Sequence, residues 1–465
     1  MSKESKHLIV IGGGPAGYAS AIRAAQLGAR VTVVEKEVLG GICLNKGCVP
    51  TKTLAKSAEI FYRTKNLKEL GINIKQVSLD FDTVKERKNN VVATFQQSVL
   101  NLLDHYNVEI IQGQAEFLES KIIKVKSGDK EPRILNADSY VIATGSKDIA
   151  LPELSVDNEN VLSYSDMLNI SEVPDTLLIV GGGVIGIEFA SIFAQLGSTV
   201  YLIEKMPDIL TFLDDDVVSL LKDELFEKGI TFYTGAEITG LERNDRGLQV
   251  EIKAAAEHFS LETEKILVAV GRNPSLENLG LDTIGIQYDQ DGISINDFME
   301  TNLPGIYAAG DVTGGHLLAS VAYYEARLAA ENCMGAKKRM GAKAVPQCIF
   351  TSPEIAGVGL TEKEARQKSD KVSIEYFPFA YNGKALAEGM SNGFIKIIME
   401  EEYQEILGCF IVGSGATELI QHLSLAINLE TTIEDLAETI YAHPTLSEVI
   451  GEVALKAAKK PLHIF

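Results

Sequence analysis

Residues 8–37 read LIVIGGGPAGYASAIRAAQLGARVTVVEKE, and residues 178–206 repeat the pattern as LIVGGGVIGIEFASIFAQLGSTVYLIEKM. Each copy has a short apolar run, the spacing G-x-G-x-x-G, a helical run and a second apolar run that ends in glutamate. This order is typical of a βαβ unit that binds a dinucleotide, because the glycines permit a tight turn, a close approach to the pyrophosphate and close packing of helix on strand. The equivalent residues are Gly12, Gly14, Gly17 and Glu35 in the first copy and Gly181, Gly183, Gly186 and Glu204 in the second. The repeat predicts an α/β protein with two dinucleotide sites.

The glutamate at the end of each copy indicates which dinucleotide the site prefers. A carboxylate at this position accepts a hydrogen bond from a ribose hydroxyl. Glu204 would repel a 2′-phosphate, and no arginine follows it in the sequence KMPDIL, so the second site is predicted to bind NAD rather than NADP. The first site adjoins a pair of cysteines and is predicted to bind FAD.

The cysteine pair lies in residues 39–56, LGGICLNKGCVPTKTLAK, where four residues separate Cys43 from Cys48. Pro50 and the helical run after it predict a helix that begins at Pro50, since proline is favoured at the first helical position. The partial positive charge of a helix N-terminus favours a thiolate, which is the reactive form of cysteine. Two buried, reduced cysteines are the alternative, and the dinucleotide units on both sides favour a redox pair.

Composition restricts the class of protein. The chain has 465 residues, 46% of them hydrophobic, and a net charge of −21, which predicts two to four domains and argues against a nucleic-acid partner. Five scattered cysteines fit neither a secreted disulfide scaffold nor a zinc site, so no metal is expected. The apolar stretch 177–197 contains Glu188 and a run of three consecutive glycines, which argue against a membrane helix. The N-terminal sequence shows no signal-peptide cleavage site, so we expect a cytoplasmic protein without a membrane association.

The remaining segments complete the two units and add a third. Helices are expected over 51–70 and 81–106, short strands over 108–126, and strands at 139–146 and 265–274. Asp311 follows a strand and precedes a helix expected over 319–334, where it is either a helix-capping acid or a contact to the ribityl chain of a flavin. After about residue 345, strands and the helices expected over 415–428 and 431–440 predict a separate α+β domain. Near its end, His443 precedes Pro444, which is expected to start a helix that contains Glu448, and His443 and Glu448 are either a structural or a catalytic pair.

The motifs GGGPAGY, GGICLNKGCVPTK, ATGS, GGGVIGIE, VGRNP, IYAAGDV, FTSPE and AHPTLSE, in this order, resemble the pyridine nucleotide–disulfide oxidoreductases over essentially the whole chain. The resemblance implies two Rossmann-like dinucleotide-binding domains, one inserted in the other, and a C-terminal α+β dimerisation domain. The implied boundaries are 1–147 and 277–345 for the two parts of the FAD domain, 148–276 for the NAD domain and 346–465 for the interface domain.

The resemblance also implies roles for individual residues. Cys43 would be the interchange thiol that meets the substrate, and Cys48 the thiol that faces the flavin. Lys52 and Glu188 would form an ion pair beside the flavin, while His443 of the partner subunit, oriented by Glu448, would act as acid–base. The implied FAD contacts are Gly12, Gly14, Gly17, Glu35, Lys52, Thr144, Gly145, Asp311 and Ala319, and the implied NAD contacts are Gly181, Gly183, Gly186, Glu188, Glu204 and Gly271.

Within the family, the sequence is most similar to enzymes that oxidise a protein-bound dihydrolipoyl group and reduce NAD. That similarity implies a homodimer whose partner is the lipoyl domain of a 2-oxoacid dehydrogenase acyltransferase or of a glycine cleavage carrier protein. Three alternatives are a reductase of glutathione or another soluble disulfide, a flavin NADH oxidase, and a structural subunit that docks on a transferase core. Ile42, Lys46, Ser320 and Lys384 depart from the usual family pattern, and the charge of Lys46 is expected to lower the pKa of a nearby thiol.

Overall fold

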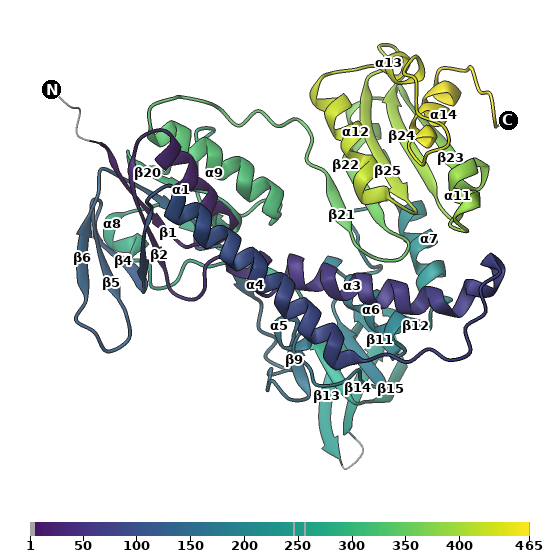
Figure 1. The fold of residues 1–465 in the computed structure, drawn as a ribbon, viewed down its shortest axis with the longest axis horizontal. Helices are drawn as coiled ribbons and strands as arrows, with labels where there is room; N and C mark the ends of the chain where they lie inside the picture. The colour runs from purple at the N-terminus through teal and green to yellow at the C-terminus, as the bar shows by residue number, and fades with distance from the viewer. Residues whose placement is uncertain (1–4, 245–246, 255–256, 465) are drawn as a thin grey trace.

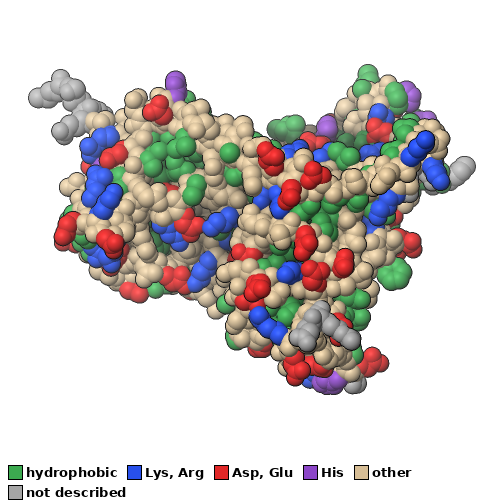
Figure 2. All heavy atoms as spheres, turned by 60° about the horizontal axis from the view of Figure 1, so that its bottom comes forward, with side chains coloured by type: hydrophobic (Ala, Val, Ile, Leu, Met, Phe, Trp, Pro, Cys, Tyr) green, Lys and Arg blue, Asp and Glu red, His purple; other side chains and the backbone are tan. Residues whose placement is uncertain are grey.

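The computed structural model describes residues 5–244, 247–254 and 257–464. Residues 1–4, with which the predicted first domain begins, and residue 465 lie outside the described residues. Figure 1 shows the two nucleotide-binding units joined by long helices, with the C-terminal sheet beside them. On the face in Figure 2, acidic and basic side chains of the described residues are interspersed rather than gathered in a basic stripe.

The first unit is built on a parallel sheet whose strand order is β20-β7-β1-β2-β3. Its strands are β1 (His7–Ile11), β2 (Arg30–Glu35), β3 (Glu109–Gln112), β7 (Ser139–Ile142) and β20 (Ile306–Ala308). In β1, four consecutive residues are buried, as expected for a strand covered on both faces. One face carries α1 (Pro15–Gln26) and α9 (Ala319–Cys333), which lie side by side (Figure 1). The other face carries an antiparallel sheet of β4 (Gln114–Glu119), β5 (Ile122–Lys126) and β6 (Arg133–Asn136).

The second unit repeats this plan with a parallel sheet of order β12-β11-β10-β16-β9. Its strands are β9 (Val161–Ser163), β10 (Thr176–Val180), β11 (Thr199–Glu204), β12 (Ile230–Thr234) and β16 (Lys265–Val268). The unit also contains α5 (Tyr164–Met167), α6 (Val184–Leu196), α7 (Asp215–Phe226) and the antiparallel strands β13 (Ala236–Asn244), β14 (Gly247–Ala254) and β15 (Glu257–Thr263). The apolar stretch 177–197 is therefore a strand, a turn and a buried helix. Of the helices in the described residues, none has the length and apolar character needed to cross a membrane.

The second unit is inserted in the first, because β20 and α9 return to the first unit after the second is complete. The chain leaves through β8 (Ser146–Asp148) and returns through β17 (Arg272–Pro274), and these two strands pair antiparallel. The short elements α8 (Leu281–Ile284), β18 (Tyr288–Asp289), β19 (Gly292–Ile293) and the 3-10 helix η2 (Asp311–Thr313) complete this return.

The cysteine pair lies where two helices meet the first sheet. Cys43 is in the short helix α2 (Gly41–Asn45), and Cys48 is the first residue of α3 (Cys48–Arg63). The prediction that this helix begins at Pro50 is wrong by two residues, so Pro50 is its third residue. The 3-10 helix η1 (Thr64–Leu70) and the long helix α4 (Phe81–His105) follow. Helix α3 packs against both α4 and α6.

The C-terminal unit is an antiparallel sheet of order β21-β22-β25-β24-β23 with helices against it (Figure 1). Its strands are β21 (Gln347–Ile349), β22 (Ile355–Gly359), β23 (Val372–Pro378), β24 (Phe394–Glu400) and β25 (Ile406–Val412). Its helices are α10 (Glu362–Lys368), η3 (Phe379–Tyr381), α11 (Gly383–Ala387), α12 (Ala416–Asn428), α13 (Ile433–Ala437) and α14 (Glu448–Ala457). The expected helix over 431–440 is thus shorter, and the final helix begins at Glu448 rather than at Pro444. Glu448 accepts the Thr445 N–H at 2.8 Å, so a turn precedes this helix.

A buried lysine joins the C-terminal sheet to the second unit. Lys396 of β24 is 1% exposed, and its Nζ lies 3.0 Å from Asp214 Oδ2, 3.1 Å from Asp216 Oδ2 and 3.2 Å from Glu362 Oε2. Asp214 and Asp216 lie at the start of α7, and Tyr376 of β23 donates its hydroxyl to Asp216 at 2.8 Å. One ammonium group therefore pairs with carboxylates from two units.

Candidate active site

A cavity of about 1970 Å³ runs between the two nucleotide-binding units. Typical ligand pockets measure about 300–1,000 Å³, so this cavity is large enough for more than one ordinary ligand. It is lined by these predicted site residues: Gly12, Gly14, Glu35, Cys43, Cys48, Lys52, Thr144, Gly145, Gly181, Gly183, Glu188, Glu204, Gly271, Asp311 and Ala319. The predicted residues that do not line it are Gly17, Gly186, His443 and Glu448.

The glycines of both units lie where the sequence pattern places them. Gly12 has a φ of +103°, and a Cβ on it would lie 2.3 Å from the carbonyl oxygen of Ala143. A Cβ on Gly17 would lie 1.8 Å from the Gly12 oxygen, so Gly17 permits close packing inside the unit rather than contact with a ligand. Gly181 and Gly186 repeat both relationships in the second unit.

The helices that follow these glycines expose backbone donors to the cavity. Helix α1 follows Gly14 and helix α6 follows Gly183, and neither has a side chain that caps its first amide groups. Uncapped N–H groups at a helix N-terminus are suited to phosphate, so both cradles fit the pyrophosphate of a dinucleotide.

The two terminal glutamates are held by the same pair of backbone hydrogen bonds. Glu35 accepts the N–H groups of Gly13 and Glu37, each at 2.6 Å. Glu204 accepts those of Gly182 at 2.6 Å and Met206 at 2.7 Å. Each carboxylate oxygen keeps further lone pairs, so an oriented acceptor remains for a ribose hydroxyl.

The cysteine pair consists of two free thiols with different acidities. The pKa of Cys48 is lowered to about 7, mainly by the hydrogen bond from Cys43 and also by the charge of Lys52, against the opposing effect of burial. The same hydrogen bond and burial raise the pKa of Cys43. The positive charge that acts on Cys48 is therefore that of Lys52, whereas Lys46 pairs with Glu37 Oε2 at 2.9 Å on the surface.

Lys52 and Glu188 form an ion pair that links α3 to α6. Lys52 Nζ lies 3.0 and 2.8 Å from the two carboxylate oxygens of Glu188, which also accepts the Phe350 N–H at 3.0 Å. The ammonium lies 4.5 Å from the centroid of the Phe350 ring. Because the Glu188 side chain is only 5% exposed, this pair holds its position beside the cavity.

His443 and Glu448 form a second pair, away from the cavity of their own chain. His443 Nδ1 lies 2.8 Å from Glu448 Oε1, and the histidine side chain is 79% exposed. Burial raises the pKa of Glu448, but hydrogen bonds from the Thr445 N–H and His443 outweigh it and lower that pKa overall. The carboxylate therefore orients the imidazole and leaves Nε2 accessible on the surface.

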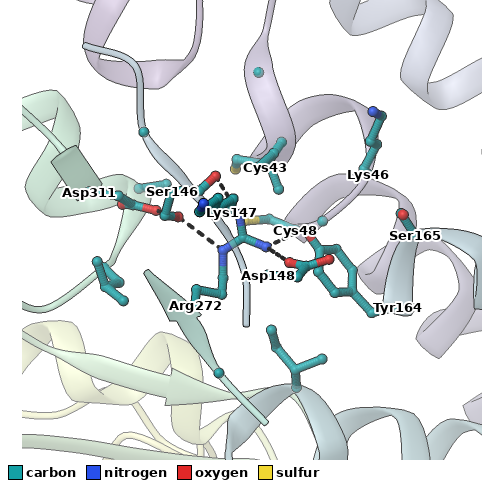
Figure 3. Close-up of a pocket in the computed structure, with 18 of the residues that line it drawn as sticks. Cys43, Lys46, Cys48, Ser146, Lys147, Asp148, Tyr164, Ser165, Arg272 and Asp311 are labelled. Atoms are coloured by element: carbon teal, nitrogen blue, oxygen red, sulfur yellow. Dashed lines mark hydrogen bonds and ion pairs between the residues drawn. The ribbon is translucent and has the colours of Figure 1, made fainter. Parts of the chain in front are cut away.

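Asp311 lines the cavity beside Ser146 (Figure 3). It does not cap the following helix, which begins at Ala319 after Leu318. Its Oδ2 accepts the hydroxyl of Ser146 at 2.5 Å. Four further polar residues, which the sequence analysis did not predict as site residues, line the cavity near Asp311: Ser146, Asp148, Tyr164 and Arg272. The position of Arg272 within the VGRNP motif is the sequence feature that could have indicated it.

The site is an acidic thiol beside a lysine, between two cradles for dinucleotides. Among the described residues, no three His, Cys, Asp or Glu side chains are placed to hold a metal ion. This combination defines the class of disulfide oxidoreductases that use a flavin and a nicotinamide dinucleotide.

Comparison with known proteins gives the family. Residues 6–326 match the Pyridine nucleotide-disulphide oxidoreductase family, and residues 345–454 match the dimerisation domain of the same family. The chain belongs to this family: it is an oxidoreductase that uses FAD and NAD and carries a dimerisation domain.

Its relatives are similar over nearly their full length. The chain is 39% identical to a dihydrolipoyl dehydrogenase of Bacillus subtilis over 98% of this chain and 99% of the relative. The same name belongs to a relative in Geobacillus stearothermophilus, also 39% identical, over 98% and 97% of the two chains. Among solved structures, LpdA from Mycobacterium tuberculosis has a TM-score of 0.91 at 28% identity, covering 97% of this chain and 99% of that one. The HOCl-induced flavoprotein disulfide reductase RclA from Escherichia coli has a TM-score of 0.86 at 26% identity, covering 96% and 99%.

Proposed function

We propose that this protein oxidises the dihydrolipoyl group of a partner protein to the lipoyl form and reduces NAD. The observation that carries the proposal is the pairing of Cys43 with an acidic Cys48 beside Lys52, between two dinucleotide cradles. Full-length similarity to dihydrolipoyl dehydrogenases supports this substrate over other disulfides.

The chemistry begins with removal of a proton from a substrate thiol. Nδ1 of His443 is engaged by Glu448, so Nε2 of His443 of the partner subunit takes the proton. The substrate thiolate attacks Cys43 Sγ of a Cys43–Cys48 disulfide, the S–S bond breaks, and Cys48 leaves as a thiolate. The second substrate thiol attacks the substrate sulfur of the mixed disulfide, the S–S bond to Cys43 breaks, and Cys43 leaves and takes up the proton of that thiol as the oxidised lipoyl group is released. The cysteine pair then holds both electrons and is in the reduced state, with two free cysteines, that the structure shows.

The low pKa of Cys48 suits it to the role of leaving group, because a stable thiolate leaves faster. When bound, FAD supplies the electron acceptor for the cysteine pair, and NAD supplies the final hydride acceptor. Lys52, held by Glu188, supplies positive charge at this side of the cavity.

We further propose a homodimer in which each active site uses the partner's His443, since this residue lies outside the cavity of its own chain. The protein partner would be the lipoyl domain of a 2-oxoacid dehydrogenase acyltransferase or of a glycine cleavage carrier protein. The same proposal includes the domain limits 1–147, 148–276, 277–345 and 346–465. It also includes a cytoplasmic location, and the free, buried Cys333 and Cys409 are compatible with a reducing compartment.

A stepwise anaerobic reduction followed by absorbance tests the proposal. Dihydrolipoamide and then NADH are added to the holoenzyme, and we expect a long-wavelength band after two electrons, from the Cys48 thiolate against oxidised flavin. Turnover with dihydrolipoamide and NAD should accompany it, and Cys43→Ser should abolish that turnover. Bleaching of the flavin without the band would contradict the proposal and favour an NADH oxidase, and a preference for glutathione disulfide with NADPH would favour the related reductase.

A further inference from the structure

The chain passes between the two nucleotide-binding units through one short antiparallel pair of strands, β8 and β17. Arg272 is opposite Asp148 in this pair, and Pro274 is opposite Ser146. The residues that carry the chain out of the first unit therefore contact those that bring it back. Both strands also lie at the wall of the cavity that contains Asp311 (Figure 3).

The guanidinium of Arg272 spans this connection. Its Nε donates to Ser146 Oγ at 2.9 Å, and its Nη2 donates to the Ser146 carbonyl oxygen at 2.8 Å. Its Nη1 contacts Asp148 and the hydroxyl of Tyr164, whose ring centroid lies 5.4 Å from the guanidinium carbon. The arginine side chain is 11% exposed, so these contacts fix it in one orientation.

The arginine also fixes the direction of the next hydrogen bond. A guanidinium only donates, so Ser146 Oγ must accept from Nε. A serine hydroxyl carries a single hydrogen, which is then directed to Asp311 Oδ2 at 2.5 Å. Ser146 is 5% exposed, so water has little access to compete for this hydrogen. The result is a directed chain from Arg272 through Ser146 to the Asp311 carboxylate.

We propose that Arg272 is a positioning residue for FAD, which acts through Ser146 to hold the Asp311 carboxylate in the orientation that accepts a hydroxyl of the flavin's ribityl chain. This inference rests on the proposed placement of Asp311 at the flavin. With one oxygen held by Ser146, the carboxylate keeps its remaining lone pairs for the cofactor. Because Arg272 belongs to the strand that ends the second unit, the arrangement of the NAD-binding unit also sets how tightly the first unit holds FAD.

The contact with Asp148 alone does not account for this arrangement. The Asp148 side chain is 42% exposed, and exposed ion pairs contribute little to stability. A lysine would satisfy that ion pair, but it lacks the planar fork that donates to the hydroxyl and the carbonyl of Ser146 together. Arg272→Lys therefore separates the ion pair with Asp148 from the hydrogen bonds to Ser146.

The test is the dissociation constant of FAD for the apoprotein, measured by calorimetric titration, beside the melting temperature of each apoprotein. We expect Ser146→Ala and Arg272→Met each to raise the Kd about 10-fold, the factor given by one hydrogen bond of ordinary strength. The double variant should show no more than the larger single effect, since both changes break one chain. Arg272→Lys should bind FAD as weakly as Arg272→Met. Arg243→Met is the matched control, because Arg243 pairs with Asp157 on a surface hairpin of the second unit, and it should leave the Kd unchanged.

The outcomes separate this inference from the proposal on which it rests. Asp311→Ala should raise the Kd at least as much as Ser146→Ala. If Asp311→Ala weakens binding and Ser146→Ala does not, Arg272 does not act through the serine and the inference is wrong. If Asp311→Ala also leaves the Kd unchanged, Asp311 is not at the flavin and both statements fail. Ser146→Ala removes only one oxygen atom, so its Kd for FAD tests the inference even if Arg272→Met does not fold.

Discussion

Lys396→Met removes a buried cation that pairs with carboxylates of two units. The Lys396 ammonium, 1% exposed, lies within 3.2 Å of oxygens of Asp214, Asp216 and Glu362. Burial lowers the pKa of this lysine, but the carboxylates of Asp214 and Asp216 outweigh burial and raise it overall. Methionine has a similar length and fills the space, so the change tests the charge rather than the volume.

Removing one partner of a buried ion pair costs about 3–5 kcal/mol, because the other charge stays buried without compensation. Here that charge belongs to Asp214, which is 9% exposed, whereas Asp216 and Glu362 are each 33% exposed and Glu362 also pairs with Arg366. The entropy of unfolding is about 2.1 cal/mol/K per residue, or roughly 1 kcal/mol/K for a chain of 465 residues. If the subunit unfolds as one body, the melting temperature of Lys396→Met should therefore fall by about 3–5 °C.

The assay is thermal unfolding of the holoenzyme, followed by circular dichroism at pH 7 to 9. The matched control is Lys371→Met, since Lys371 pairs with Glu402 on the surface of the same C-terminal unit, with both side chains more than half exposed. This control should lie within about 1 °C of the unchanged protein. Equal melting temperatures for the two variants would refute the reasoning.

The pH dependence has a definite sign. A lysine whose pKa is raised on folding contributes stability that is complete below its ordinary value of 10.5 and is lost as the pH rises through the folded value. The difference between Lys396→Met and the unchanged protein should hold from pH 7 to 9 and shrink only above about pH 10.5.

Three further predictions concern the proposed reaction. His443→Gln should slow oxidation of dihydrolipoamide by about 10²–10⁴-fold, as expected for a lost acid–base group. The same variant should keep electron transfer from NADH to a dye. Equal loss of both activities would indicate that His443 has a structural role. Glu204→Arg should shift the ratio of kcat/KM values from NAD toward NADP, because the arginine would donate hydrogen bonds to a 2′-phosphate, and an unchanged ratio would contradict the ribose assignment. The Cys48 thiolate is lost as the pH falls through about 7, so the long-wavelength band should be stronger at pH 8 than at pH 6. Lys52→Met should move that loss to higher pH, and a band that is independent of pH would exclude the titration of Cys48.

The two dinucleotide-binding units could be predicted from the sequence because their turns depend on residues close together in the chain. A Cβ on Gly12 or Gly17 would meet backbone within 2.3 Å, so the spacing of these glycines encodes a turn directly. The same argument applies to the second copy, so the glycine spacing predicted both dinucleotide units, whereas the inserted order of the units was implied by the family resemblance. The ends of helices depend on less local contacts: Pro50 and Pro444 were each expected to start a helix, and neither does.

The polar cluster around Arg272 could not be read from the sequence, because its partners are far apart along the chain. The hydrogen bond from Arg272 to Ser146 spans 126 residues, and the bond from Ser146 to Asp311 spans 165. No periodicity relates such positions. The antiparallel pairing of β8 with β17 brings Arg272 to Ser146, and the packing of η2 against β17 brings Asp311 to them.

The insertion of one unit in the other sets the order in which the sites are completed during synthesis. Every strand of the second parallel sheet lies between residues 161 and 268, so this sheet is whole once that stretch has left the ribosome. The first sheet waits for β20, which begins at Ile306, although β1 is the first strand made. At roughly 5–20 residues per second, the ribosome needs about 8–30 s to pass from β7 to β20. The nascent chain therefore holds a finished NAD cradle before its FAD cradle can close.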